Sequence, residues 1–120
     1  MTGYIVFAHG SSLQSANDAV RNVARQAAAR SGWQDYETAF LEGIDTRLPV
    51  AVDALAARGI SRIVIVPYFL TFGIHLERDL PALVEQARQV HPEMQFDVRG
   101  PLDGHPAMVD VVVDRARESA

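Results

Sequence analysis

Two of the chain's four histidines, His9 and His75, lie in sequence surroundings that favour a chemical role. His9 ends a run of hydrophobic residues and is followed by Gly10, which frees the backbone, and by two serines. Histidine has a reference pKa of about 6.5, so it can bind a metal ion or accept a proton near neutral pH. Most isolated histidines are structural, but the position of His9 at the end of a predicted strand favours function.

His75 ends an unusually apolar segment, residues 67–75, with the sequence Pro-Tyr-Phe-Leu-Thr-Phe-Gly-Ile-His. Such a loop either covers a large, flat apolar ligand or partner, or folds onto the protein's own core. Asp79 can orient the His75 ring if both residues already lie on one helix, four positions apart. We expect Asp79 to be the N-cap of that helix, with Pro81 in its first turn, and the two roles are compatible.

Glu42 is the third candidate ligand, although most glutamates are solvated surface residues. Beside His9 and His75 it would complete a set of two imidazoles and one carboxylate. Such a set with open positions suits Fe²⁺, Co²⁺, Ni²⁺ or Zn²⁺ better than Mg²⁺ or Ca²⁺. The chain has no cysteine, so any bound metal must be held by nitrogen or oxygen ligands.

Three further polar positions invite weaker predictions. Gly10-Ser11-Ser12 precedes a predicted helix, so its amides can receive an anionic group such as a carboxylate. His91 is expected at a helix end, where an imidazole interacts with the helix dipole. His105 is expected at a helix start, where a role in the wall of a site and a surface role are equally open.

The pattern of hydrophobic residues predicts four strands that alternate with four helices. The expected strands are residues 4–8, 35–41, 61–67 and 95–99, and the expected helices are residues 14–31, 47–58, 79–90 and 106–118. This order predicts a single α/β domain over residues 1–120, with a four-stranded parallel sheet and helices on both faces.

Open parallel sheets bind ligands beyond the carboxyl ends of their strands. His9, Glu42 and His75 each follow a different predicted strand, and residues 101–105 follow the fourth. The first and third strands are expected to be neighbours where the strand order reverses. The candidate residues should therefore meet at one edge of the sheet.

The last predicted helix has an apolar face that is broad for a single contact with a sheet. Its members are Met108, Val109, Val111, Val112, Val113 and Ala116. A helix that is apolar on most sides is usually buried on most sides. We interpret the extra face as an interface with a second subunit, although valine-rich packing in a short helix can also look broad.

Composition narrows the function classes. The net charge of −4 argues against general affinity for nucleic acid or anionic membranes. The longest apolar run, residues 63–72, is interrupted by Pro67 and Thr71 and is too short to span a bilayer. With no visible targeting segment and no cysteine, we expect a cytoplasmic protein.

At the motif level, several segments resemble the CbiX/SirB family of sirohydrochlorin chelatases. They are Ala8-His9-Gly10-Ser11, Phe40-Leu41-Glu42, residues 67–75 with Asp79-Leu80-Pro81, and Pro101-Leu102 with residues 109–116. The resemblance covers nearly the whole chain, and the segment around His75 is the specific part. Ala8 departs from the glycine of many members, with little expected effect because His9 stays in place.

The resemblance implies a chelatase (a lyase) that inserts Co²⁺ or Fe²⁺ into sirohydrochlorin, in cobalamin or sirohaem biosynthesis. The metal would be a substrate, with no cofactor permanently bound, and the short, single-unit form would work as a homodimer. By similarity, His9 and His75 would bind the metal, and His9 would also accept a pyrrole proton. Glu42 would be a third ligand or a substrate contact. The tetrapyrrole site would be lined by Ser11, Leu70, Thr71, Phe72, Gly73, Ile74 and His75.

Elementary chemistry supports assigning these family roles to the residues of this chain. Insertion of M²⁺ expels two pyrrole protons, so a base is needed beside the incoming metal. The metal must also stay loosely held, which favours two or three protein ligands over four. Arg47 and Arg78 are candidates to bind the peripheral carboxylates of the substrate. The residues do not distinguish cobalt from iron, since both accept the same ligands.

Three other functions compete with this interpretation. A histidine phosphatase requires arginine directly before its nucleophile, where this chain has Ala8. A receiver-like signalling domain requires clustered acids after the first strand, where His9-Gly10-Ser11 stands instead. A non-catalytic module that carries tetrapyrrole or metal would use the same residues, and only turnover distinguishes it from an enzyme.

Overall fold

The computed structural model describes residues 1–119, and Ala120, the last residue of the predicted domain, lies outside them. Strands and helices alternate along the chain. They are β1 (Thr2–Ala8), α1 (Gln14–Ser31), β2 (Tyr36–Phe40), α2 (Leu48–Ala57), β3 (Arg62–Pro67), α3 (Gly73–Val90), β4 (Gln95–Val98) and α4 (Ala107–Arg117). Within this part of the chain, no helix is long and apolar enough to cross a membrane.

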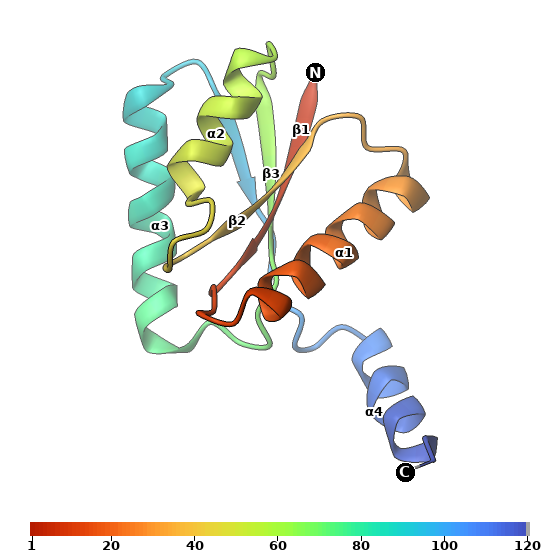
Figure 1. Cartoon of the computed structure of the whole chain (residues 1–120). Coiled ribbons are helices and arrows are strands. Elements are labelled where there is room, and N and C mark those ends of the chain that lie inside the picture. The colour runs from red at the N-terminus through yellow and green to blue at the C-terminus, as the bar shows by residue number, and fades with distance from the viewer. Residues whose placement is uncertain (120) are drawn as a thin grey trace.

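The four strands form one parallel sheet in the order β2-β1-β3-β4 (Figure 1). Val6 of the central strand β1 pairs with Thr38 of β2 on one side and with Val66 of β3 on the other. The chain moves to one side after β1 and to the other side after β2, so crossovers of one hand place α1 on one face of the sheet and α2 and α3 on the other. The predicted α/β fold and the predicted neighbourhood of the first and third strands are both confirmed.

Helices cover the two faces of the sheet unequally (Figure 1). On one face, α2 and α3 close the main core over Ile5, Phe7 and Ile65, whose side chains are fully buried. On the other face, α1 packs on β1 and β2 through the small buried residues Ala24 and Ala28. Small side chains allow close approach of the helix, and Gly32 ends it in the left-handed conformation.

The expected start of α3 is wrong by six residues. The helix begins at Gly73, so Asp79 is not its N-cap and Pro81 lies inside it. An interior proline costs about 3 kcal/mol. Burial of Leu76 contributes about 1.5–3 kcal/mol, and the longer helix adds backbone hydrogen bonds before the proline. Tertiary packing therefore overrides the local signal for a helix start.

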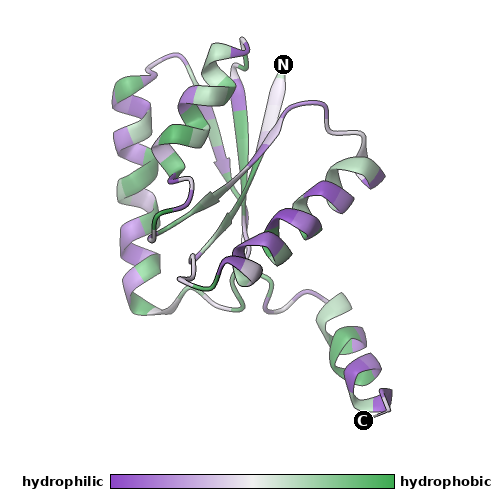
Figure 2. Cartoon of the chain, viewed as in Figure 1, coloured by the Kyte–Doolittle hydropathy of each residue, from purple (hydrophilic) through white to green (hydrophobic). Residues whose placement is uncertain are grey.

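The last helix differs from its expected placement. It was expected to pack on the sheet with one part of its apolar face, but α4 has no buried residue and stands away from the domain (Figure 1). Val109 and Val112 are 65% and 67% exposed, and Figure 2 colours stretches of this helix green, as hydrophobic. The tether before it, residues 99–106, is held to the domain. The Leu102 and Asp103 amides donate hydrogen bonds to carbonyls of the loop after β3.

Candidate functional site

His9 and Glu42 meet at the carboxyl edge of the sheet. The His9 Nε2 atom lies 3.3 Å from Glu42 Oε1, and both side chains are about 60% exposed. The other ring nitrogen, Nδ1, lies 3.1 Å from the Gly10 carbonyl oxygen. When Nδ1 carries the proton and donates a hydrogen bond to that carbonyl, the Nε2 lone pair is free and faces the carboxylate.

The separation of these two atoms fits two ligands of one metal ion. Ligands about 2.1 Å from an ion at octahedral or tetrahedral angles are about 3.0–3.4 Å apart. The observed 3.3 Å between His9 Nε2 and Glu42 Oε1 falls in that interval. An exposed pair also leaves coordination positions open, so the ion can be taken up and released.

The backbone holds the two loops together. The Leu41 and Glu42 amides donate hydrogen bonds to the carbonyls of Ala8 and His9, which extends the β1–β2 pairing beyond the strands. Gly10 has a φ of +94°, and a Cβ at this position would lie 2.2 Å from the Glu42 carbonyl oxygen. Only glycine permits this approach, and the approach places His9 beside Glu42.

The variant Gly10→Ala should therefore damage the site and the fold together. Strain in the left-handed region and the forced shift of the Glu42 backbone should lower the free energy of unfolding by about 2–4 kcal/mol. Gly43→Ala is the matched control, since Gly43 has a φ of +98° but open space around it. Urea denaturation of both variants measures the free energy of unfolding, and the difference between them is the effect of the clash with the Glu42 carbonyl. Equal free energies would contradict the close approach at Gly10.

His75 lies at the same edge, exposed on the first turn of α3. Its ring does not join His9 and Glu42, because no three metal-ligating side chains within residues 1–119 gather around one point. Asp79 accepts a hydrogen bond from Arg78 Nε at 3.2 Å. The structure thus brings together two of the three predicted ligands, and the ligand role of His75 stays a prediction.

Exposed apolar side chains follow the strands at the same edge of the sheet. Leu70 and Ile74, which the sequence indicated, are 64% and 83% exposed. Leu13 and Ile44, which the sequence reasoning missed, are 64% and 103% exposed. Each missed residue lies in a strand-end loop just after a predicted site residue, Leu13 after Ser11 and Ile44 after Glu42, and that position is the signal that could have found them. We call Leu13, Ile44, Leu70 and Ile74 the apolar rim.

The rest of the predicted apolar segment divides between site and core. Thr71 and Gly73 are exposed, whereas Phe72 is half-buried and packs against the core together with Phe69. The Phe69 ring also meets the His9 ring edge to face, with centroids 6.4 Å apart. The segment therefore divides, because Phe69 and Phe72 anchor the loop to the core while Leu70 and Ile74 face outward. That its exposed part covers an apolar ligand stays a prediction.

The other predicted polar residues have local partners. The Ser11 amide donates to Asn17 Oδ1, so it is not free for an anion. Arg47 Nε donates to the Gly43 carbonyl. His105 is exposed, and its Nδ1 accepts a hydrogen bond from the Ala107 amide at the start of α4.

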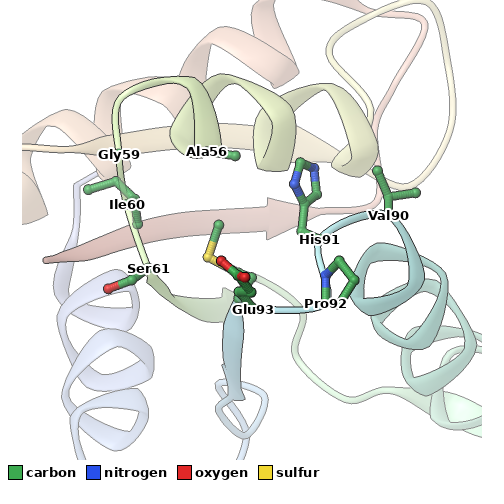
Figure 3. Close-up of a pocket in the computed structure, with 9 residues that line it drawn as sticks. Ala56, Gly59, Ile60, Ser61, Val90, His91, Pro92 and Glu93 are labelled. Carbon is green, nitrogen blue, oxygen red and sulfur yellow. The ribbon is translucent and has the colours of Figure 1, made fainter.

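A pocket lies at the opposite, amino edge of the sheet (Figure 3). It is lined by the end of α2 and the loop between α3 and β4. His91 lines it, and its Nε2 is 2.7 Å from Asp53 Oδ1 of α2. The ring of His91 therefore joins two helices, which differs from its predicted interaction with the helix dipole alone. The apolar rim and the His9–Glu42 pair are far from this pocket along the strands.

Comparisons with family models and with known proteins point to the same family. A family model described as CbiX matches residues 3–119. The chain is 24% identical over 139 residues to the sirohydrochlorin cobaltochelatase of Methanopyrus kandleri, covering 99% of this chain and 97% of that protein. It is 27% identical over 113 residues to the chloroplastic sirohydrochlorin ferrochelatase of Arabidopsis thaliana, covering 94% of this chain but only 50% of that protein.

Solved structures share the fold. A CbiX protein of cobalamin (vitamin B12) biosynthesis from Marinobacter aquaeolei VT8 superposes with a TM-score of 0.84 at 25% identity, over 99% of this chain and 100% of the other. The sirohydrochlorin chelatase SirB of Bacillus subtilis subspecies spizizenii, in complex with cobalt, gives a TM-score of 0.89 at 21% identity. This chain covers half of that longer protein, with 97% of its own residues aligned.

Proposed function

Because this chain belongs to the CbiX family, we infer that it is a sirohydrochlorin chelatase, which inserts a divalent metal, Co²⁺ or Fe²⁺, into that tetrapyrrole. The observation on this chain that carries the inference is the His9–Glu42 pair, spaced at 3.3 Å for one ion and framed by the apolar rim. The incoming metal is a substrate in this reaction, and our proposal includes no permanently bound cofactor.

We propose that His9 Nε2 and a Glu42 oxygen hold the metal at the edge of the macrocycle. As the metal passes to the pyrrole nitrogens, it leaves the Nε2 lone pair free. Nε2 then accepts one pyrrole proton, and the carboxylate 3.3 Å away relays it to solvent or accepts the second proton. The charges balance, since one M²⁺ enters the ring as two protons leave.

The apolar rim suits the face of the macrocycle. Leu13, Ile44 and Leu70 come from three loops and Ile74 from the first turn of α3, and all four are at least 64% exposed. Covering exposed apolar area contributes roughly 25 cal/mol per Å², so a flat tetrapyrrole that spans these side chains gains affinity without a deep pocket. We propose that His75 completes the metal site when the substrate has closed over this edge.

Turnover tests the proposed function. Sirohydrochlorin and Co²⁺ or Fe²⁺ are mixed anaerobically with catalytic amounts of the protein, and the absorbance of the metallated product is followed. Many turnovers above the uncatalysed rate are expected, and the faster metal indicates the physiological one. A spectral change that stops at one equivalent per site would mean a carrier, and no change would overturn the assignment.

We further propose a cytoplasmic homodimer that forms through α4. The helix exposes Val109, Val111, Val112 and Val113 on a short tether. On the α1 face of the sheet, α1 packs on β1 and β2, while the β3–β4 half carries the half-exposed Arg62–Asp97 ion pair. In each copy, α4 packs on nothing and no helix covers the β3–β4 half of this face. The two features suit a dimer in which α4 of one copy packs on the sheet of the other. The cysteine-free composition is compatible with the cytoplasm.

Two aspartates on the apolar face of α4 should separate the dimer. The double variant Val109→Asp with Val112→Asp places charges at positions three apart, on one face of the helix. Light scattering at micromolar concentration should give the mass of a monomer for this variant and of a dimer for the native chain. Arg117→Asp, on the same helix at a polar position, is the control and should stay dimeric. A monomeric native chain would contradict the proposal.

A further inference from the structure

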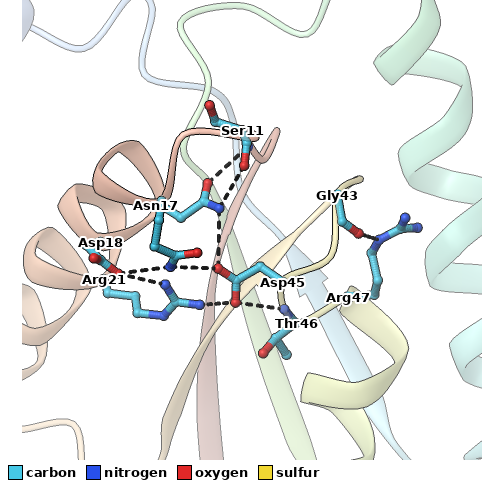
Figure 4. A network of polar contacts seen from close by, with 9 residues as sticks. Ser11, Asn17, Asp18, Arg21, Gly43, Asp45, Thr46 and Arg47 are labelled. Carbon is cyan, nitrogen blue, oxygen red and sulfur yellow. Dashed lines mark hydrogen bonds and ion pairs between the residues drawn. The ribbon is translucent and has the colours of Figure 1, made fainter.

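Asn17 is a buried polar residue in the first turn of α1, only 4% exposed. Its Oδ1 accepts a hydrogen bond from the Ser11 amide at 3.0 Å, and its Nδ2 donates to the Ser11 carbonyl at 3.0 Å. The same Nδ2 also lies 3.3 Å from Asp45 Oδ2 (Figure 4). One amide side chain therefore binds both backbone groups of Ser11 and reaches a second loop.

Asp45 is the anchor of that second loop, between β2 and α2. Its carboxylate receives hydrogen bonds from Arg21 and Gln14 of α1 and from the Thr46 amide (Figure 4). Burial acts to raise the pKa of Asp45, but these hydrogen bonds, with the charge of Arg21, lower it below its usual value. The carboxylate is therefore ionised and firmly held at neutral pH.

The two loops joined by Asn17 are those that carry His9 and Glu42. Ser11 follows His9 by two residues, and Asp45 follows Glu42 by three. The side chain of Asn17 makes its hydrogen bonds to Ser11 and Asp45 rather than to His9 or Glu42, and it lies on a helix that packs on the sheet. The link is therefore well placed to fix the spacing of the two loops from behind, while the ligand side chains themselves stay exposed.

We propose that Asn17 is a positioning residue, which sets the distance between His9 Nε2 and Glu42 Oε1 for metal binding by joining Ser11 to Asp45. This inference rests on the proposed function, because it acts through the metal-holding pair. A merely structural residue would contribute stability alone. A positioning residue must also change metal affinity and kcat, since a displacement of about 1 Å at a reacting centre can cost on the order of 100-fold.

Co²⁺ alone, without tetrapyrrole, is the first probe. Binding of Co²⁺ to the full-length protein is followed through its visible absorbance, with His9→Ala as the reference for loss of the site. We expect Asn17→Ala to raise the Kd at least about 10-fold, in the range found for residues that support metal ligands. In turnover, kcat should fall by a larger factor than KM for sirohydrochlorin rises, because Leu70 and Ile74 of the apolar rim lie outside the two joined loops.

Two further variants keep the test decisive if Asn17→Ala folds poorly. Asn17→Asp retains an acceptor for the Ser11 amide but places a carboxylate against Asp45, so it should lose metal affinity. Combining it with Asp45→Asn restores one amide and one carboxylate across the same gap, with donor and acceptor exchanged. The combination should recover part of the Co²⁺ affinity that Asn17→Asp alone has lost, because the donor to the Ser11 carbonyl is still missing.

Asp53→Asn is the control for stability, because it weakens the His91 contact at the opposite edge of the sheet. It should lower the Tm and leave the Kd for Co²⁺ unchanged. Asn17 variants that lower only the Tm would overturn the inference, as would a native protein that binds no Co²⁺. A native protein that binds Co²⁺ in an Asn17-dependent way but never turns over would refute the proposed function and leave the positioning role intact.

Discussion

The variant His9→Ala is expected to lose metal insertion almost completely and to keep its fold. Two contributions disappear together, the nitrogen that holds the metal and the base that receives the pyrrole proton. A positioned general base alone is worth about 10²–10⁴-fold in rate, so we expect kcat/KM to fall by at least about 1000-fold. The side chain of His9 is 60% exposed, so circular dichroism and urea denaturation should change little.

The matched control for this experiment is His91→Ala. His91 is also a histidine with a carboxylate partner, Asp53, but it lies at the amino edge of the sheet. The control should turn over at the native rate even if it is somewhat less stable. Native activity in His9→Ala would remove the basis of the proposed site, whereas inactivity of both variants would indicate a general effect of losing a histidine–carboxylate contact.

The variant His75→Ala is expected to cost about 100-fold or more in kcat/KM, because a metal held by only two protein ligands is poorly placed for transfer. In the structure, His75 stands apart from the His9–Glu42 pair. We therefore expect a modest loss of affinity for Co²⁺ alone and a large loss of turnover once the tetrapyrrole is present. A large loss of turnover with a small loss of Co²⁺ affinity would show that His75 joins the metal only when the tetrapyrrole is bound. Equal losses would show that it binds the metal beforehand.

A double-mutant cycle tests whether the two histidines act on one ion. If they share it, the losses of His9→Ala and His75→Ala are strongly non-additive, since the first substitution already destroys the function that the second would impair. Independent, additive losses would mean that His75 acts elsewhere, for example on the substrate's periphery. Full activity of His75→Ala would exclude it from the machinery.

The fold was largely predictable because its signals are local. The pattern of hydrophobic residues predicted four strands alternating with four helices, and the eight elements and the parallel sheet were confirmed. The start of α3 was not predictable in this way. Pro81 is typical of a first turn, and the burial of Leu76 against a core assembled from distant segments overrode that signal.

The candidate site was predictable in part. Because parallel strands end at one edge, the sequence placed His9, Glu42 and His75 at the same edge of the sheet. It could not predict that His9 pairs with Glu42 while His75 stands apart, since this depends on the backbone contact at Gly10. The sequence likewise gave no sign that Asn17 joins two loops, because its partners lie 6 and 28 positions away.

By itself, then, the sequence determined which residue types are available for chemistry and which edge of the sheet they share, because strand order and side-chain chemistry follow from local patterns. Only the tertiary structure decided distances, burial and partners, because these depend on contacts between segments that are far apart in the chain. The apolar helix α4 illustrates the division. Its sequence predicted a broad apolar surface, and in the folded chain that surface is exposed.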